Sequence, residues 1–206
     1  MDMDLRERLE EETRKAEEKQ PVIDRDKNRL ALHLMPPVGW INDPKGLQMP
    51  DYTLYAITDR KWLAPGETLA NAVEKAIQGG ATIIQLREKT LTGEALEAEA
   101  ISVQKVCRKY NVPFIINDDV ELAKRIDADG VHIGQDDMAL PEARAILGDD
   151  KIIGVTAKTI ELARKAMEGG ASYLGSGAVF GSTTKTDARP MTLDMFQSIC
   201  ESVNIP

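Results

Sequence analysis

Apolar and polar positions follow a regular alternation from residue 52 onward. Short apolar runs rich in β-branched side chains predict strands over residues 52–58, 82–87, 113–117, 130–134, 151–156 and 172–177. Between and after them, apolar residues recur with a helical period, which predicts helices over residues 67–79, 92–109, 119–126, 139–147, 159–169 and 192–203. Strands that alternate with helices are typical of parallel βαβ units.

The predicted strands are apolar on both faces, as a parallel sheet covered by helices requires. The six units are compatible with a doubly wound sheet or with part of a (β/α)₈ barrel. No G-x-G-x-x-G phosphate-binding pattern follows the first strand, which favours the barrel. We therefore predict an α/β fold of the (β/α)₈ TIM-barrel type, truncated to about six βα units.

The alternation of strand-like and helix-like segments is absent before residue 51. Residues 1–28 are crowded with acidic and basic side chains and predict a charged helical or disordered arm. Residues 29–50 hold several prolines and glycines without a sustained period, which is typical of a loop. We thus expect three parts: the arm, a loop-like leader at 29–50, and an incomplete barrel domain at 51–206.

Composition limits the partners of this 206-residue chain. Its net charge of −8 argues against nucleic acid and anionic membranes, which attract proteins rich in Lys and Arg. Cys107 and Cys200 lie in helical patterns without C-x-x-C spacing, so neither a disulfide scaffold nor a zinc site is expected. No signal-like or membrane-spanning apolar stretch occurs, and we expect a cytoplasmic protein.

Polar residues gather where the predicted strands end, which is where barrel enzymes place their active sites. The groups are Gln85, Arg87 and Lys89; Asn117, Asp118 and Asp119; Gln135, Asp136 and Asp137; Thr156 and Lys158; and Ser182, Thr183, Thr184 and Lys185. Two carboxylates from neighbouring strand ends suit Mg²⁺, which also keeps phosphate oxygens in its shell. Together with nearby cations they predict a site for a diphosphate and a metal.

Each of these residues also has a simpler interpretation. Asp119 is well placed to cap the helix that follows it, and Asp136 is compatible with a solvated loop acid. Arg87 and Lys89 are ordinary surface charges when they are considered alone, and Ser182 and Thr183 suit a turn. The recurrence of such groups at successive strand ends favours the functional interpretation.

The segments LYAITDR, GGATIIQLREK, FIINDD, ADGVHIGQDD, IIGVTAKT and GASYLGSGAVFGSTTKTDA together resemble the thiamine-phosphate synthase family. The resemblance covers residues 51–206 and implies a (β/α)₈ barrel. It implies a reaction that joins hydroxymethylpyrimidine diphosphate to a thiazole phosphate and releases pyrophosphate through a dissociative step, without a side-chain nucleophile.

The resemblance also implies a role for each matched residue. Gln85, Arg87 and Lys89 would contact the diphosphate, Asn117 the pyrimidine, and Asp118 and Asp137 the Mg²⁺ ion. The thiazole phosphate would be held by Ser182, Thr183 and Thr184, and Lys185 would contact the diphosphate. Thr156 stands where the family usually has serine and keeps the hydroxyl group.

One departure from the family shapes our expectations. The family's last two βα units, which complete the thiazole-phosphate site, have no counterpart in residues 51–206. We therefore expect little or no synthase turnover from this chain, and self-association through the open edges of the barrel. A second hypothesis is a catalytically inactive barrel that binds ligand or self-associates. A tautomerase-like barrel is a third, which the diphosphate-type residues disfavour.

The stretch HLMPPVGWINDPKG resembles a different family, the glycosidases that cleave fructosides such as sucrose and its phosphate. The resemblance covers residues 29–48 and implies that Asp43 stands at the nucleophile position, with Lys45 replacing the usual asparagine. Two-carboxylate glycoside hydrolysis needs a second acid that this segment lacks. We expect a chimera without fructosidase activity, and we rank a working fructosidase fragment lowest among the hypotheses.

Overall fold

The main sheet has six parallel strands that lie side by side in the order of the sequence. The structure is a computed structural model that describes residues 39–42, 48–179 and 190–206. The strands are β3 (Tyr55–Ile57), β4 (Ile83–Leu86), β5 (Phe114–Asn117), β6 (Gly130–Ile133), β7 (Ile152–Thr156) and β8 (Tyr173–Gly175). A doubly wound sheet reverses its strand order, so the unbroken order confirms the barrel-type prediction.

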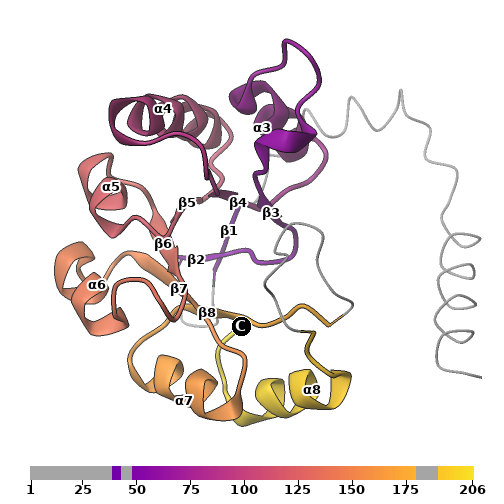
Figure 1. Cartoon of the computed structure of the whole chain (residues 1–206), viewed down its shortest axis with the longest axis vertical. Coiled ribbons are helices and arrows are strands. Elements are labelled where there is room, and N and C mark those ends of the chain that lie inside the picture. The colour runs from indigo at the N-terminus through magenta and orange to yellow at the C-terminus, as the bar shows by residue number, and fades with distance from the viewer. Residues whose placement is uncertain (1–38, 43–47, 180–189) are drawn as a thin grey trace, which may run out of the picture. The chain divides into compact units, whose positions relative to one another are not determined.

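The helices surround the strands on the outside of the curled sheet (Figure 1). A short 3₁₀ helix, η1 (Arg60–Trp62), follows β3. The α-helices are α3 (Leu69–Gln78), α4 (Gly93–Lys109), α5 (Val120–Arg125), α6 (Leu140–Leu147), α7 (Ile160–Glu168) and α8 (Leu193–Ser202). All six helices predicted from the hydrophobic period are confirmed, and so are the six strands.

Side-chain caps fix where several of these helices begin. Thr68, Asp119, Thr159 and Thr192 each accept a hydrogen bond from the backbone N–H three residues further along. Such caps satisfy N–H groups that have no partner inside the helix. The capping interpretation of Asp119 is thereby confirmed, because its Oδ1 accepts the Leu122 N–H at 2.8 Å.

Alternate residues of each strand point outward and bury themselves against the helices. The outward set includes Ile84, Leu86, Phe114, Ile116, Val131, Ile133, Ile153 and Val155. They meet helix residues such as Val73 on α3 and Val103 on α4 in one large core. Burying each such side chain contributes about 1.5–3 kcal/mol, so this layer is the main source of stability.

The remaining strand residues point into the barrel, where a second core is formed by Ile83, Ile115, Ile152 and Tyr173. The Tyr173 ring lies so close to β7 that a Cβ atom at position 154 would come within 2.0 Å of its Cζ. Only Gly154 leaves room for the ring. A glycine in a central strand marks a close approach of this kind.

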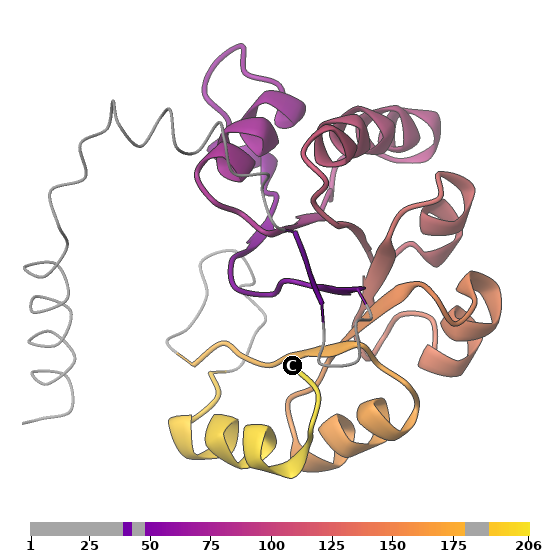
Figure 2. The ribbon, with the colours of Figure 1, turned by 180° about the vertical axis from the view of Figure 1, so that it is seen from behind.

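An antiparallel hairpin lies across one end of the strands (Figure 2). Its strands are β1 (Trp40–Asn42) and β2 (Gln48–Pro50). Trp40 packs against the interior core, and the backbone of Gly39 approaches Pro113, just before β5. The hairpin therefore covers the amino-terminal end of the barrel, which we call the floor.

The hairpin differs from the loop-like leader expected over residues 29–50. Packing of Trp40 on the floor supplies an apolar contact that no local period in the sequence reveals. Residues Pro37–Pro206 form one compact unit, so the described part of the leader belongs with the barrel. The arm at 1–28 lies outside the described residues, and the three-part division remains a prediction.

In the described part of the chain, β3 and β8 are the two edges of the main sheet. The last residues run beside β8, because the Leu174 N–H donates to the Pro206 carbonyl at 2.8 Å. Among the described helices, none combines the length and apolar character needed to cross a membrane.

We predict that Trp40→Ala lowers the free energy of unfolding by about 2 kcal/mol, because it removes the large apolar side chain that covers the floor. Ile41→Ala is the matched control, since Ile41 is 47% exposed on the same strand. Its effect is expected to stay within about 0.5 kcal/mol. Urea unfolding of both variants measures the difference, and equal effects would contradict the role given to Trp40.

Candidate functional site

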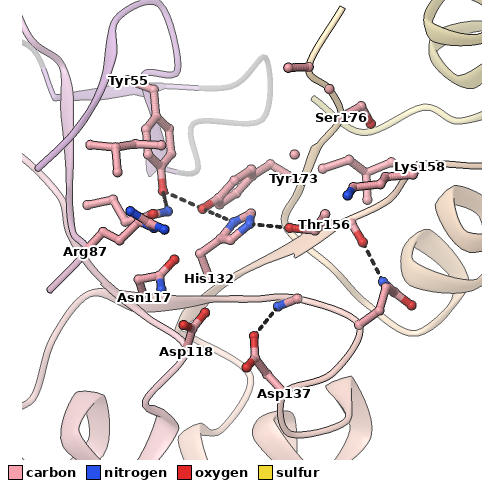
Figure 3. A pocket seen from close by; sticks show the side chains of 18 of the residues that line it. Tyr55, Arg87, Asn117, Asp118, His132, Asp137, Thr156, Lys158, Tyr173 and Ser176 are labelled. Carbon is pink, nitrogen blue, oxygen red and sulfur yellow. Dashed lines mark hydrogen bonds between the residues drawn. The ribbon is translucent and has the colours of Figure 1, made fainter. Parts of the chain in front are cut away.

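A pocket of about 1000 Å³ opens at the carboxyl-terminal ends of the six parallel strands (Figure 3). Every strand contributes to its wall: Ile57, Gln85, Asn117, His132, Thr156 and Gly175. These positions alternate with the strand residues that pack against the helices, so they face the pocket. Its size suits a small-molecule ligand.

Two carboxylates come together at the mouth of the pocket. Asp118 directly follows β5, and its backbone N–H continues the ladder by donating to the His132 carbonyl at 2.8 Å. Asp137 lies in the loop after β6, where its Oδ2 accepts the Gly134 N–H at 2.6 Å. Figure 3 shows the two carboxyl groups on the same side of the pocket.

Asp118 and Asp137 influence each other's ionisation. Burial works to raise the pKa of Asp118, but the Lys89 ammonium and a hydrogen bond with Asp137 hold that pKa below its usual value. Burial and the neighbouring Asp118 carboxylate raise the pKa of Asp137, despite its bond to the Gly134 N–H. The adjacency expected from neighbouring parallel strands is therefore present, and a bound cation would relieve the repulsion.

Two cationic side chains line the same pocket as the carboxylates. Lys89 Nζ lies 2.8 Å from Asp118 Oδ2, and more than half of the lysine side chain is exposed. Arg87 lines the pocket, and its backbone N–H donates to the hydroxyl of buried Thr58 at 2.9 Å. The pocket therefore carries both positive and negative charge on its wall.

The other predicted site residues divide into three groups. Asn117 and Thr156 line the pocket from the ends of β5 and β7. Gln85 also lines it but is only 3% exposed, and its side-chain amide donates to the Tyr55 hydroxyl at 2.9 Å. Ser182, Thr183, Thr184 and Lys185 lie outside the described residues.

A chain of hydrogen bonds crosses the barrel interior beneath the mouth. The Tyr55 and Tyr173 hydroxyls are 2.6 Å apart, and Tyr173 lies 2.9 Å from His132 Nδ1. His132 Nε2 in turn lies 2.9 Å from the Thr156 hydroxyl. With the Gln85 amide, this network joins residues of β4, β3, β8, β6 and β7.

Of this network, Gln85 and Thr156 were predicted from the sequence as site residues, whereas Tyr55, Tyr173 and His132 were not. The alternation along the strands was a usable signal. His132 lies between Val131 and Ile133, which pack against the helices, and Tyr173 precedes Leu174, which does the same. Both His132 and Tyr173 therefore face the interior of the barrel. Inward polar side chains in an apolar barrel need hydrogen-bond partners. Their exact pairing could not be read from the chain.

The carboxylates of the pocket also bear on metal binding. Within the described ranges, no group of three or more His, Cys, Asp and Glu side chains is close enough together to hold a metal ion. Asp118 and Asp137 offer two carboxylates, which is a common protein contribution to Mg²⁺ when a phosphorylated ligand supplies further oxygens. The residues present would fit a divalent metal that also binds oxygens of a ligand.

Comparison with known proteins gives one consistent family. Residues 54–206 match the family model described as thiamine monophosphate synthase. The thiamine-phosphate synthase of Ruminiclostridium cellulolyticum is 46% identical over 156 residues, which cover 76% of this chain and 74% of that enzyme. The corresponding enzyme of Clostridium novyi is 48% identical over 157 residues, covering 76% of each chain.

Solved structures agree with the sequence comparisons. The thiamine phosphate pyrophosphorylase of Pyrococcus furiosus superposes with a TM-score of 0.66 at 37% identity, covering 74% of this chain and 71% of that one. An N-acetylmannosamine-6-phosphate 2-epimerase from Clostridium perfringens gives a TM-score of 0.53 at 13% identity, covering 74% and 73% of the two chains. The second likeness concerns the fold alone.

The buried tyrosines predict a loss of stability in alkali. Burial raises the pKa of Tyr55 to about 12 from an ordinary value of 10.0, and burial beside Tyr55 raises the pKa of Tyr173 well above 10.0. Because the folded-state pKa values exceed the unfolded ones, the stabilisation is complete below about pH 10 and is lost as the pH rises.

We therefore expect the urea midpoint to fall between about pH 10 and pH 12, with phenolate absorbance appearing together with unfolding. Tyr173→Phe should be less stable at neutral pH, because it removes two hydrogen bonds, and should show a shallower alkaline fall. Phenolate absorbance that appears fully near pH 10 in the folded protein would contradict the buried network.

Proposed function

The chain belongs to the thiamine monophosphate synthase family, and on that premise we propose that its strand-end pocket binds the two substrates of thiamine phosphate synthesis. The reaction joins hydroxymethylpyrimidine diphosphate to a thiazole phosphate and releases pyrophosphate. The observation that carries the proposal is the meeting of two interacting carboxylates, Asp118 and Asp137, with two cations at one mouth of the barrel.

The charges at the mouth suit a diphosphate that leaves. Arg87 and Lys89 offer donors and positive charge to the oxygens that gain negative charge as the bond to pyrophosphate breaks. Lys89 is ion-paired with Asp118 in this structure and is more than half exposed, so it is free to turn toward a phosphate. Asn117 and Thr156 offer hydrogen-bonding groups to the pyrimidine from the neighbouring wall.

Mg²⁺ is the cofactor we propose, held by Asp118 and Asp137 together with substrate oxygens. When bound, it would neutralise charge on the departing pyrophosphate. The fit rests on the two carboxylates that line the same pocket, Asp118 and Asp137, whose mutual repulsion raises the pKa of Asp137 and would be relieved by a cation.

The amino-terminal resemblance to fructoside-cleaving glycosidases remains a separate hypothesis. Asp43 and Lys45, which carry it, lie outside the described residues, and the family match begins only at residue 54. We propose that the segment contributes no hydrolysis, because the matching stretch lacks a second acid. A cytoplasmic location also remains a prediction.

The first test measures pyrophosphate release from both substrates with Mg²⁺. It compares this chain with a version extended by the last quarter of the Ruminiclostridium cellulolyticum enzyme. We expect the extended chain to turn over and the 206-residue chain to be at least about 100-fold slower. In the described residues, no further strand pairs with the sheet edges β3 and β8. We expect the thiazole phosphate to be poorly held for this reason, since the family binds it with strand ends beyond these six.

In the extended chain, Asp137→Asn should lower turnover at least about tenfold, because one of the two carboxylates that hold the metal is lost. Asp150→Asn removes the same charge at the opposite end of β7 and should leave turnover unchanged. An extended chain that is inactive, or one that is indifferent to both Asp137→Asn and a chelator, would refute the proposed function.

The open side of the barrel also suggests self-association with a second copy of this chain. Exposed apolar side chains occur on edge strand β3 and on α8, including Ile57 at 55% and Phe196 at 38% exposure. Apolar groups beside an unpaired sheet edge favour association.

Sedimentation velocity over a range of concentrations should therefore show reversible dimers. Phe196→Lys should weaken them, because it places a charge on this apolar side. Met49→Lys is the matched control: Met49 is 39% exposed but lies on the floor hairpin. A chain that stays monomeric at all concentrations would contradict this part of the proposal.

A further inference from the structure

Glu88 lies between the two proposed phosphate-binding cations but faces the other way. Arg87 and Lys89 line the pocket, whereas Glu88 is absent from its wall. The Glu88 side chain is only 3% exposed. Glu88 is therefore buried away from the pocket, while the residues on either side of it line the pocket.

The buried carboxylate holds the turn that follows β4. Glu88 Oε1 accepts the backbone N–H groups of Lys89 at 2.8 Å and Thr90 at 2.7 Å, and the Thr90 hydroxyl at 2.6 Å. Burial works to raise the pKa of this carboxyl, but the Thr90 donors and Arg60 hold it at about 2. The Glu88 carboxylate is thus charged, and three donors of the turn form hydrogen bonds with it. Hydrogen bonds to an ionised group are stronger than those between neutral groups.

The second oxygen ties the turn to its surroundings. Glu88 Oε2 accepts Arg60 Nε at 2.8 Å, and Arg60 Nη2 continues to Glu99 Oε2 at 2.7 Å. Arg60 comes from η1, after β3, and Glu99 from α4. One carboxylate therefore connects the loops after two neighbouring strands and fixes the backbone from which Lys89 extends.

We propose that Glu88 is a positioning residue for diphosphate binding, which keeps Arg87 and Lys89 directed at the pocket by holding the 87–90 turn to Arg60. This inference rests on the proposed function, since the diphosphate is its ligand. Cations that are already held in place lose less freedom when a ligand binds, so releasing the turn weakens binding without removing any group that touches the ligand.

Glu88→Gln is the sharpest probe. Glutamine keeps the shape and one acceptor oxygen, but its amide NH₂ must face either the guanidinium of Arg60 or the N–H groups of the turn, and all of these are donors. Glu99→Gln is the matched control, because it removes another carboxylate from Arg60 and leaves the turn untouched.

Two quantities are measured for the full chain and for each variant. The first is the dissociation constant of inorganic pyrophosphate with excess Mg²⁺, by calorimetry. The second is hydrogen exchange of the Lys89 and Thr90 amides. We expect Glu88→Gln to weaken pyrophosphate binding about tenfold and to speed exchange at both amides, with both quantities changed less than about twofold in Glu99→Gln.

Each outcome has a distinct meaning. If the unaltered chain does not bind pyrophosphate with Mg²⁺, the proposed function fails and this inference fails with it. If the chain binds but Glu88→Gln binds equally well, the inference alone is overturned. Equal weakening by Glu88→Gln and Glu99→Gln would also overturn it, because the effect would then be general destabilisation through Arg60.

If Glu88→Gln does not fold, the same two measurements are made on Thr90→Val. It removes the hydroxyl donor to Glu88 Oε1, leaves the carboxylate in place, and changes an exposed residue that is absent from the pocket wall. A weakening of about threefold with faster amide exchange supports the inference, and unchanged binding overturns it.

Discussion

This six-stranded fold depends on the packing and hydrogen bonding of the Tyr173 side chain inside the barrel. A curled parallel sheet must fill its interior, and here the ring of a tyrosine on edge strand β8 packs in the space left by Gly154. Its hydroxyl meets Tyr55 on the opposite edge strand, β3, and His132 in the middle of the sheet. The two edges are therefore linked across the interior even though no described strand joins them side by side.

Three layers follow along the barrel axis from this arrangement. Trp40 and the hairpin close the floor, the tyrosines and His132 fill the middle, and the strand ends carry the charged residues. The lower layers are buried, whereas the mouth is open to solvent. A packed support beneath a charged mouth is the condition that a site needs in order to hold a diphosphate and a metal in a fixed geometry.

Much of this organisation could be predicted from the sequence because it follows from local periods. The strand and helix alternation predicted the barrel, the spacing of Asp119 before a helix predicted its cap, and parallel neighbouring strands predicted that Asp118 and Asp137 would meet. Features that depend on distant contacts could not be predicted. Tyr55 and Tyr173 are separated by 118 positions, the floor hairpin depends on packing of Trp40, and Glu88 shows its role only through Arg60.

The central claim is that a divalent metal and a diphosphate bind together at the carboxyl-terminal mouth. Mn²⁺, a paramagnetic ion that accepts carboxylate and phosphate oxygens, tests it through line broadening in amide NMR spectra. With pyrophosphate present, substoichiometric Mn²⁺ should broaden the amide signals of Asp118, Gly134 and Asp137 and leave the Trp40 indole signal on the floor sharp. Broadening at the floor, or none at the mouth when pyrophosphate is present, would contradict the account.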